Sequence, residues 1–437
     1  MRCVLATFII CLCHSLLTFS LLIQPTAIDA ADWPVFRGGV ESTQRGRAEG
    51  SGYPKEWSPE QNVAWRFPLP AGGNSSPVVS QGKVFVTCAT DDGAKRHLFC
   101  LDAKTGQELW KQSVSYNKPE PTHKTNPHCG SSPAVDDDHV VVWHGSAGVF
   151  CYSLDGKKLW EHQTGPIHHI WGTGSSPIID GKIVYLNIGP GEITHMLALS
   201  LTDGQTIWKT PEPGGDSGEN GPNGEKAEWI GSWSTPQIAI IDGHRQVVCA
   251  MPTRVVGYDA ETGTPVWWCT GVAKTNGTQL VYTDPLLTKS YAVTLGGFKG
   301  PGIGFWLRGE GDITKTARNW RVTKENPQRI GSGVIVGDHI YAPTAGLNGI
   351  QCINLESGEV LWTERTPAAF WGSMILADEH IYVTDQSGKT FVIKPDPQKL
   401  LTPHQNALNE PSNSTPAFAD GTIFLRTYKA VYRITKE

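Results

Sequence analysis

The chain is built from short runs of β-branched and other apolar residues, separated by turns that contain glycine and aspartate. This pattern repeats at roughly 40–60 residues, a period typical of a β-propeller in which each repeat forms one blade. The first clear unit contains, in chain order, Ser75-Ser76-Pro77, Val78-Val79, Gly82, Val84-Phe85-Val86, Leu98 to Leu101, Asp102-Ala103-Lys104-Thr105-Gly106 and Trp110. Because turn residues bound each apolar run, the unit predicts a series of strands joined by tight turns.

The opening of the unit, in which small polar residues precede a proline, recurs along the chain. Further forms are Ser131-Ser132-Pro133, Ser175-Ser176-Pro177, Ser234-Thr235-Pro236, Thr283-Asp284-Pro285 and Ser414-Thr415-Pro416. Gly331-Ser332-Gly333 and Gly372-Ser373-Met374 keep the position without the proline. These openings predict an all-β propeller of eight blades, with seven blades as the alternative if one weak repeat does not form a sheet.

Most units close with a turn, usually at a glycine, that is followed by a tryptophan. Glycine adopts the positive φ of such a turn without steric cost, and a tryptophan on the outermost strand can pack between neighbouring blades and bury about 150–250 Å². We assign this structural, blade-docking role to Trp65, Trp110, Trp160, Trp208, Trp267, Trp320 and Trp362, and to the turn glycines Gly106, Gly263 and Gly358.

The two ends of the repeat region complement each other. The last unit contains three apolar runs, which end at Val431-Tyr432-Arg433-Ile434, and it has no closing tryptophan. Residues 62–67, before the first opening, have the pattern of an outermost strand without a blade. We therefore predict that this N-terminal strand completes the last four-stranded antiparallel blade and leaves no open sheet edge. The propeller is expected to span residues 62–437 as one domain, after an N-terminal extension at residues 31–61.

Residues 1–30 have the pattern of an export signal. Arg2 precedes an apolar stretch from Val4 to about Ile23, and Ile28-Asp29-Ala30 offers a small-residue cleavage site. A signal peptide places the mature protein in the periplasm or outside the cell. The alternative is an uncleaved membrane anchor; no later segment is apolar enough to span a bilayer.

Composition changes this picture in two respects. The chain has 37 Lys and Arg against 42 Asp and Glu, a net charge of -5, and no run of basic residues, which argues against a nucleic-acid partner. Seven cysteines follow the leader, an odd number. In an oxidising compartment Cys88 with Cys100, and Cys249 with Cys269, could bridge neighbouring strands. The alternative is that these cysteines are small buried residues on strands.

The repeat resembles the quinoprotein-type (PQQ-like) propeller repeat family. The resemblance rests on residues 101–110, Leu-Asp-Ala-Lys-Thr-Gly-Gln-Glu-Leu-Trp, which match the tryptophan-docking pattern of that family, and it extends over roughly residues 62–437. The segment Asp32-Trp33-Pro34-Val35-Phe36-Arg37-Gly38-Gly39, with Trp57 and Trp65, is similar to the N-terminal signature of secreted bacterial members without an assigned activity. The resemblance implies the fold, but it implies no single function.

In the dehydrogenases of this family, the resemblance implies a quinone cofactor (PQQ) and a calcium ion in the central funnel, beside an adjacent pair of cysteines. The present chain has no Cys-Cys pair and is shorter than those enzymes. It also contains no Gly-x-Ser-x-Gly, phosphate-loop or His-Glu-x-x-His motif. We therefore expect no cofactor and no catalytic residue, and PQQ with calcium is the alternative.

Two groups of residues near the openings are candidates for ligand binding. The aromatic group consists of Trp171, Trp229, Trp233 and Trp371, which could stack on a sugar or a planar ligand at the funnel mouth, the alternative being ordinary packing. The second group consists of the loop histidines His123, His128, His168 and His169, which could hold a transition metal if two blades bring them together. Their spacing matches no standard zinc pattern, and solvated or backbone-bonded loop histidines are the alternative.

Two loops also stand out. Residues 211–231, rich in Gly, Pro, Glu and Asn, form the longest polar insertion and predict a loop over one face, while Gly297 to Gly304 predicts a hairpin loop. The function that these observations favour is a non-catalytic exported scaffold that binds a protein partner or a carbohydrate through its funnel or one face. The alternative is a quinone- or metal-dependent oxidoreductase that uses the funnel.

Overall fold

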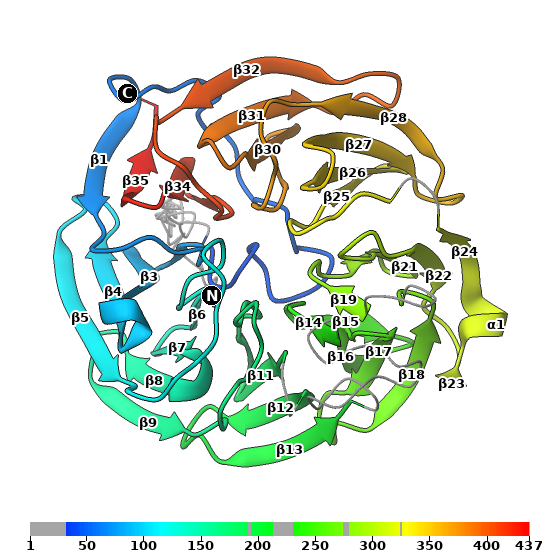
Figure 1. The fold of residues 1–437 in the computed structure, drawn as a ribbon, viewed down its shortest axis with the longest axis horizontal. Helices are drawn as coiled ribbons and strands as arrows, with labels where there is room; N and C mark the ends of the chain where they lie inside the picture. The colour runs from blue at the N-terminus through cyan, green and yellow to red at the C-terminus, as the bar shows by residue number, and fades with distance from the viewer. Residues whose placement is uncertain (1–31, 191–193, 213–229, 274–278, 324–325, 437) are drawn as a thin grey trace, which may run out of the picture. The chain divides into compact units, whose positions relative to one another are not determined.

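Each repeat folds into one four-stranded antiparallel sheet, and eight such blades surround a central channel (Figure 1). The computed structural model describes residues 32–190, 194–212, 230–273, 279–323 and 326–436, which belong to the unit from Ala31 to Glu437. The prediction of an eight-bladed propeller is confirmed, and the alternative of seven blades is wrong. Among the described residues, no helix has the length and apolar character that crossing a membrane requires.

We number the blades from the first opening. Blade 1 contains β2 (Val78–Ser80), β3 (Lys83–Thr90), β4 (Lys95–Asp102) and β5 (Glu108–Ser115). Blade 2 contains β6 (Ala134–Val135), β7 (His139–Trp143), β8 (Val149–Ser153) and β9 (Lys158–His162). Blade 3 contains β10 (Ile178–Asp180), β11 (Ile183–Ile188), β12 (His195–Ser200) and β13 (Thr206–Pro211). Blade 4 contains β15 (Gln237–Ile241), β16 (His244–Ala250), β17 (Arg254–Asp259) and β18 (Pro265–Thr270), and the short β23 (Gly311–Asp312) adds to its outer edge.

The second half of the ring follows the same order. Blade 5 contains β20 (Leu286–Leu287), β21 (Tyr291–Leu295), β22 (Gly302–Trp306) and β24 (Arg318–Val322). Blade 6 contains β25 (Val334–Val336), β26 (His339–Thr344), β27 (Gly349–Asn354) and β28 (Val360–Arg365). Blade 7 contains β29 (Ile375–Ala377), β30 (His380–Thr384), β31 (Lys389–Lys394) and β32 (Leu401–Ala407). Blade 8 contains β33 (Ala417–Ala419), β34 (Thr422–Arg426), β35 (Ala430–Ile434) and β1 (Val63–Pro68).

A few elements lie outside the blades. A parallel pair, β14 (Ile230–Ser232) with β19 (Gln279–Val281), precedes the openings of blades 4 and 5. The helical turns are η1 (Asp91–Gly93), η2 (Gly145–Ala147) and α1 (Thr314–Ala317). The hairpin loop predicted around Gly297 joins β21 to β22.

Burial along the strands follows from the position of each strand in its blade. The inner strands are covered on both faces by neighbouring blades, so β3 and β12 are buried along almost their whole length and have continuous apolar sequences. The outermost strand β5 instead alternates between half-buried and exposed residues, because only one of its faces meets a neighbour. The core therefore lies between the blades rather than at the centre of the ring.

The ring closes between the two ends of the propeller. β1 pairs antiparallel with β35, with Arg66 opposite Tyr432 and Phe67 opposite Val431 (Figure 1). The prediction that the N-terminal strand completes the last blade is confirmed. Closure in this way leaves neither terminal strand of the repeat without a partner.

Most of the repeat tryptophans contact the following blade. The Trp110 ring lies over Gly156 in the next blade, and its indole N–H donates to Leu154 O at 3.0 Å. A Cβ at Gly156 would lie 2.8 Å from that ring, and the glycine has a φ of +88°, so a side chain there would clash and strain the turn. Indole-to-carbonyl bonds of the same kind join Trp65 to Ala103, Trp160 to Leu201, Trp208 to Ala260, Trp320 to Leu355 and Trp362 to Asp396, and rings also cover Gly106, Gly263 and Gly358.

Trp267 lies differently from the other repeat tryptophans. It is completely buried within its own blade, donates to Gln246 Oε1 at 2.7 Å, and packs against Gly257. The cause is the connection into the outermost strand of blade 5, where β23 and α1 take the place of the usual glycine turn. Without that turn, the next blade offers Trp267 no matching site.

The seven cysteines of the described residues are all buried and free, so the disulfides considered from the sequence do not form. Cys88 is paired across the strands with His97, and Cys100 with Phe85, which separates the two thiols along the sheet. Cys249 and Cys269 lie on β16 and β18, with β17 between them. Cys100, Cys151 and Cys352 each stand opposite a repeat tryptophan, at the position where blades 3, 4 and 5 have alanine or glycine. These cysteines are therefore small core residues.

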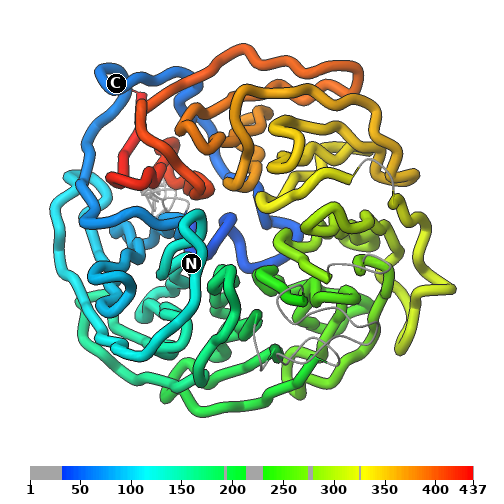
Figure 2. Tube along the Cα trace, in the orientation of Figure 1, coloured from blue at the N-terminus to red at the C-terminus, as the bar shows by residue number. Residues whose placement is uncertain are grey.

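Segment 32–48 crosses one end of the channel (Figures 1 and 2). It makes backbone hydrogen bonds to the innermost strands on several sides of the ring: Trp33 to Val79, Val135 to Pro34, Ser42 to Ile238 and Ala48 to Leu376. We call this segment the plug. Part of the N-terminal extension is thus a wall of the channel.

We predict that the native protein, prepared from residue 31 onward, does not react with an aromatic disulfide reagent at neutral pH. Burial raises the pKa of Cys100, Cys151 and Cys269 to about 12, so almost no thiolate is present. The same reagent should detect all seven thiols after unfolding in guanidinium. Rapid modification of any thiol in the native protein would contradict the buried placement.

Candidate functional site

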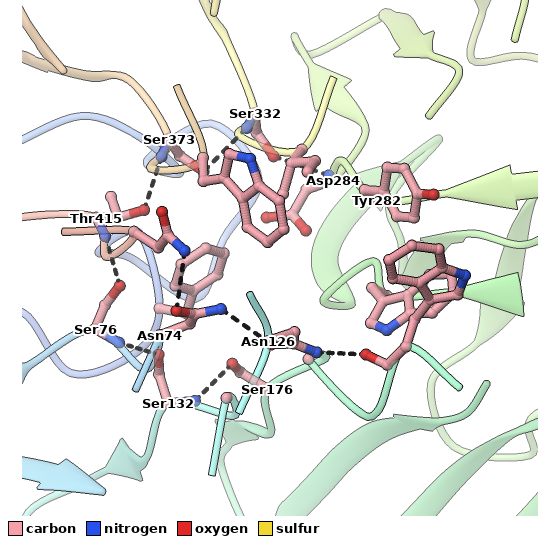
Figure 3. A pocket seen from close by; sticks show the side chains of 18 of the residues that line it. Asn74, Ser76, Asn126, Ser132, Ser176, Tyr282, Asp284, Ser332, Ser373 and Thr415 are labelled. Carbon is pink, nitrogen blue, oxygen red and sulfur yellow. Dashed lines mark hydrogen bonds between the residues drawn. The ribbon is translucent and has the colours of Figure 1, made fainter. Parts of the chain in front are cut away.

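The second residue of every opening takes part in a closed ring of hydrogen bonds around the channel. In each blade its backbone N–H donates to the side-chain oxygen of the equivalent residue in the next blade. The eight donor–acceptor pairs, at 2.8–3.2 Å, are Ser76 to Ser132, Ser132 to Ser176, Ser176 to Thr235, Thr235 to Asp284, Asp284 to Ser332, Ser332 to Ser373, Ser373 to Thr415 and Thr415 to Ser76. We call this the inner ring; Figure 3 shows most of it. The inner ring explains why the openings of blades 6 and 7 keep Ser332 and Ser373 although they lack the proline of the other openings.

Asp284 is the one carboxylate in the inner ring. Its Oδ1 accepts the ring hydrogen bond from Thr235, and its Oδ2 lies 3.4 Å from Arg37 Nη1 of the plug. Arg37 also donates to Gly333 O at 2.6 Å, and both charged side chains are almost fully buried, with exposed fractions of 0% and 2%. A buried ion pair of this kind joins the plug to blades 5 and 6.

The channel holds a cavity of about 320 Å³, near the lower end of the range for small-ligand sites. Phe36 of the plug and the inner ring contribute to its lining. A second layer is formed by the residue immediately before each opening, and we call it the entry layer: Asn74, Gly130, Gly174, Trp233, Tyr282, Ile330, Trp371 and Asn413. Loop residues Asn126, Trp171, Phe298 and Gln328 complete the wall.

One side of the cavity is lined by amides that hold one another in place. Asn74 Nδ2 donates to Thr125 O at 2.8 Å and to Asn126 Oδ1 at 3.1 Å, and Asn126 Nδ2 donates to Trp171 O at 2.7 Å (Figure 3). Asn413 donates to Tyr428 Oη at 2.6 Å and to Asn74 Oδ1 at 3.3 Å. Blades 8, 1 and 2 therefore present an ordered polar surface.

The opposite side is aromatic. The Trp233 ring lies 5.1 Å from that of Tyr282 and 5.2 Å from that of His169, measured between centroids. Its indole N–H is bonded to Gly172 O at 2.8 Å, and its backbone N–H to Val281 O next to the β14–β19 pair. These contacts fix the Trp233 ring in one orientation on the cavity wall.

The candidates from the sequence separate into two groups. Trp171, Trp233 and Trp371 line the cavity, whereas Trp229 and most of the 211–231 loop lie outside the described residues. His169 is buried behind Trp233, and burial lowers its pKa to about 4, while His168 is exposed. The metal hypothesis gains no support here: within the part of the chain that the structure describes, no three His, Cys, Asp or Glu side chains are grouped to hold an ion.

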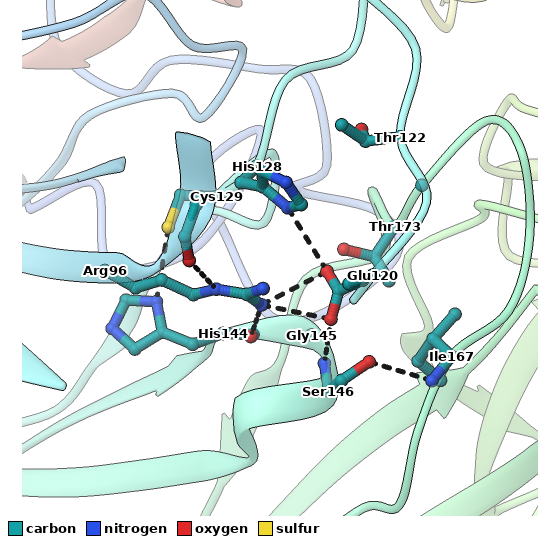
Figure 4. Close-up of polar contacts among 12 residues, drawn as sticks. Arg96, Glu120, Thr122, His128, Cys129, His144, Gly145, Ser146, Ile167 and Thr173 are labelled. Atoms are coloured by element: carbon teal, nitrogen blue, oxygen red, sulfur yellow. Dashed lines mark hydrogen bonds and ion pairs between the residues drawn. The ribbon is translucent and has the colours of Figure 1, made fainter. Parts of the chain in front are cut away.

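His128 belongs to a separate polar cluster between blades 1 and 2 (Figure 4). Glu120 accepts from Arg96 Nη1 at 3.1 Å and from the Ser146 backbone N–H at 2.7 Å, and lies 3.4 Å from His128 Nδ1. Burial acts to raise the pKa of Glu120, but the contact with His128, the charge of Arg96 and the Ser146 donors together hold it below its usual value. The neighbouring His144 has a pKa lowered to about 3, by burial and then by Arg96. This cluster fastens the loop before the second opening to blade 2.

Sequence reasoning missed the asparagines, Tyr282 and Phe298. The sequence does contain a signal for the entry layer, because each of its residues stands immediately before an opening. Asn126, Phe298 and Gln328 carry no such signal, since they enter the cavity from connecting loops.

A family model described as outer membrane protein assembly factor BamB, a propeller of PQQ-like repeats, matches residues 58–225, 198–297 and 311–395. The chain belongs to this family. The quinoprotein ethanol dehydrogenase of Pseudomonas putida is 26% identical over 227 residues, which cover 45% of this chain and 34% of the dehydrogenase. Lupanine 17-hydroxylase [cytochrome c] of a Pseudomonas species is 23% identical over 224 residues, covering 48% of this chain and 30% of the hydroxylase. The chain thus matches about a third of the length of these relatives.

Solved structures agree on the fold. A europium-containing methanol dehydrogenase superimposes with a TM-score of 0.63 at 13% identity, covering 90% of this chain and 89% of the other. BamB from Moraxella catarrhalis gives a TM-score of 0.53 at 14% identity, covering 86% of this chain and 97% of the other. At these identities the likeness establishes the PQQ-like propeller architecture alone.

A calcium–quinone group would need a flat apolar surface for the quinone and several oxygen ligands for the ion. The aromatic wall suits a planar ring, but calcium takes about 6–8 oxygen ligands, usually with several carboxylates. Asp284 is the one carboxylate among the described residues that line the cavity, and it is already bound by Arg37 and the Thr235 N–H. The residues present therefore do not fit the calcium–quinone group.

We predict that Asp284→Ser destabilises the fold by about 3–5 kcal/mol, although it gives the inner ring a hydroxyl at every position. The reason is that Arg37 then remains buried without its carboxylate. Adding Arg37→Met should recover most of the loss. Urea unfolding followed by tryptophan fluorescence measures both changes.

The matched control is Glu161→Gln, which removes an exposed ion pair with Lys158. It should change the free energy of unfolding by less than about 1 kcal/mol. If Asp284→Ser unfolds at the same urea concentration as the unaltered protein, the ion pair does not secure the plug.

Proposed function

We propose that this protein is a non-catalytic, exported binding module that holds a carbohydrate in its channel cavity. The observation that carries the proposal is the two-sided cavity, with ordered amides on one wall and fixed aromatic rings on the other. Blades 8, 1 and 2 supply the amides of Asn413, Asn74 and Asn126, and the aromatic side includes Trp233 and Tyr282.

A pyranose has two kinds of surface that match the aromatic wall and the amide wall of the cavity. Its C–H face is apolar and packs on an aromatic ring, while its ring-edge hydroxyls exchange hydrogen bonds with amide groups. The amides are held by one another, so they need little reordering when a ligand binds. The plug closes the channel beyond the inner ring, so the ligand enters from the side of the entry layer.

The same residues favour binding over catalysis. Asp284 is neutralised by Arg37, and His169 is uncharged at neutral pH because burial lowers its pKa to about 4. His169 packs against Trp233 and does not line the cavity, and the Asp284 side chain is already bound by Arg37 and the Thr235 N–H, so neither group is free to contact a bound ligand. A protein partner is the second candidate, favoured by the family model, whose description names an outer membrane assembly factor.

We predict that an oligosaccharide array identifies a ligand and that Trp371→Ala weakens its binding about tenfold, because a stacking surface of the entry layer is lost. Trp306→Ala is the matched control, since this tryptophan is 38% exposed and does not line the cavity. It should bind as the unaltered protein does. A blank array together with a native pull-down that enriches one protein would favour the protein partner instead.

We predict that titration with PQQ and calcium, followed by cofactor absorbance and melting temperature, produces no saturable change. Because any ligand that binds only the folded state raises its apparent stability, binding would be detected as a higher melting temperature. A calcium-dependent rise with a saturable spectral change would contradict the carbohydrate proposal and support the oxidoreductase alternative.

A further inference from the structure

Four arginines are buried around the channel, and among the described residues Arg37 is the one of the four that forms an ion pair, with Asp284. Arg37, Arg45, Arg329 and Arg426 have exposed fractions of 1%, 7%, 0% and 0%. Elsewhere in the described residues, the buried carboxylates Glu120, Glu212 and Glu410 each have their own arginine, namely Arg96, Arg254 and Arg66. Around the channel such pairing is incomplete.

Arg426 lies directly behind the amide wall. Its Nη1 donates to Ser75 O at 3.1 Å and to the Ser75 hydroxyl, and its Nε and Nη2 have no partner among the described residues. A Cβ on Gly73, the neighbour of Asn74, would lie 2.3 Å from Arg426 Nη2. The guanidinium thus stands one residue from the cavity lining with no carboxylate bound to it.

Arg329 occupies a comparable place in blade 6. The residues on either side of it, Gln328 and Ile330, both line the cavity. Its guanidinium donates to Gln351 Oε1 and lies 3.4 Å from Asn326 Oδ1, both of them neutral acceptors. Burial lowers the pKa of Arg329 to about 10, which still leaves it charged at neutral pH.

The plug adds two more cations at the closed end. Arg45 donates to the Phe36 and Pro236 carbonyls, while Asp284 is the carboxylate that acts on both Arg45 and Arg37. Asp385, the other buried carboxylate near the entry layer, accepts from the Ser387 and Lys389 backbone N–H groups. Among the described residues, Asp284 is thus the one carboxylate that acts on these four arginines, which leaves the surroundings of the cavity positive.

We infer that the cavity selects an anionic carbohydrate, one that carries carboxylate or sulfate groups, over its neutral counterpart. This inference rests on the proposed function and names its ligand class. Charges held in low-dielectric walls act on the space between them more strongly than exposed charges do. The guanidinium groups reach the ligand through this field, while the amides and aromatic rings make the direct contacts.

The test compares two probes of equal size, a trimer of galacturonic acid and the same trimer with every carboxylate methyl-esterified. Titration calorimetry at low salt should give an affinity at least about tenfold higher for the free acid. Equal or tighter binding of the ester would overturn the inference and leave the carbohydrate proposal standing. If an oligosaccharide array shows binding of neutral glycans alone, the inference is overturned in the same way, whereas binding of no glycan overturns both.

Variants at Arg426 test whether the buried charge is the cause. Arg426→Lys keeps the charge and Arg426→Met removes it. The affinities of both variants are measured at a temperature at which each is fully folded, as its melting curve shows. The methionine variant should lose several-fold affinity for the free acid and none for the ester, while the lysine variant keeps the preference. If the methionine variant does not fold, the comparison of the two trimers on the unaltered protein decides the matter. An unchanged preference in a folded Arg426→Met protein would overturn the role of this arginine field.

Discussion

Eight backbone N–H groups lie around the channel with no strand partner on that side, and each is satisfied by a side-chain oxygen from the next blade. Buried N–H groups without acceptors are costly, so this requirement recurs identically in every blade. It places one short polar side chain on the channel wall in each repeat. The radius of the ring, and with it the size of the cavity above, depends on this spacing.

The outer contacts of the ring have a different origin. There a large ring, such as that of Trp160, covers a glycine turn of the next blade and donates its N–H to a carbonyl. Two unlike contacts, a polar one at the axis and an aromatic one at the rim, therefore join most neighbouring blades. Blades 4 and 7 lack this rim contact: Trp267 packs within its own sheet, and β32 contains no tryptophan. The inner ring nevertheless continues unbroken through Thr235 and Asp284.

Much of the architecture could be predicted from the sequence because short local sequence patterns recur from blade to blade. The openings, the glycine turns and the unpaired strand at residues 62–67 were enough to predict the blades and their closure. The cavity was only partly predictable. Trp233 and Trp371 stand at repeat positions, but Asn126 and Phe298 arrive from loops whose course depends on tertiary packing. The Arg37–Asp284 contact joins residues 247 positions apart, and no spacing rule links them.

The pairing of β1 with β35 has a consequence for how the molecule is made. A chain synthesised from its N-terminus produces residues 63–68 long before their partner strand, 430–434. Loop-closure entropy grows slowly with length, about 0.6 kcal/mol for each doubling, so the finished ring loses little equilibrium stability by this arrangement. The cost is kinetic, because contacts between residues so far apart in the sequence form slowly. Until β1 pairs with β35, an unpaired edge strand is exposed and prone to aggregation.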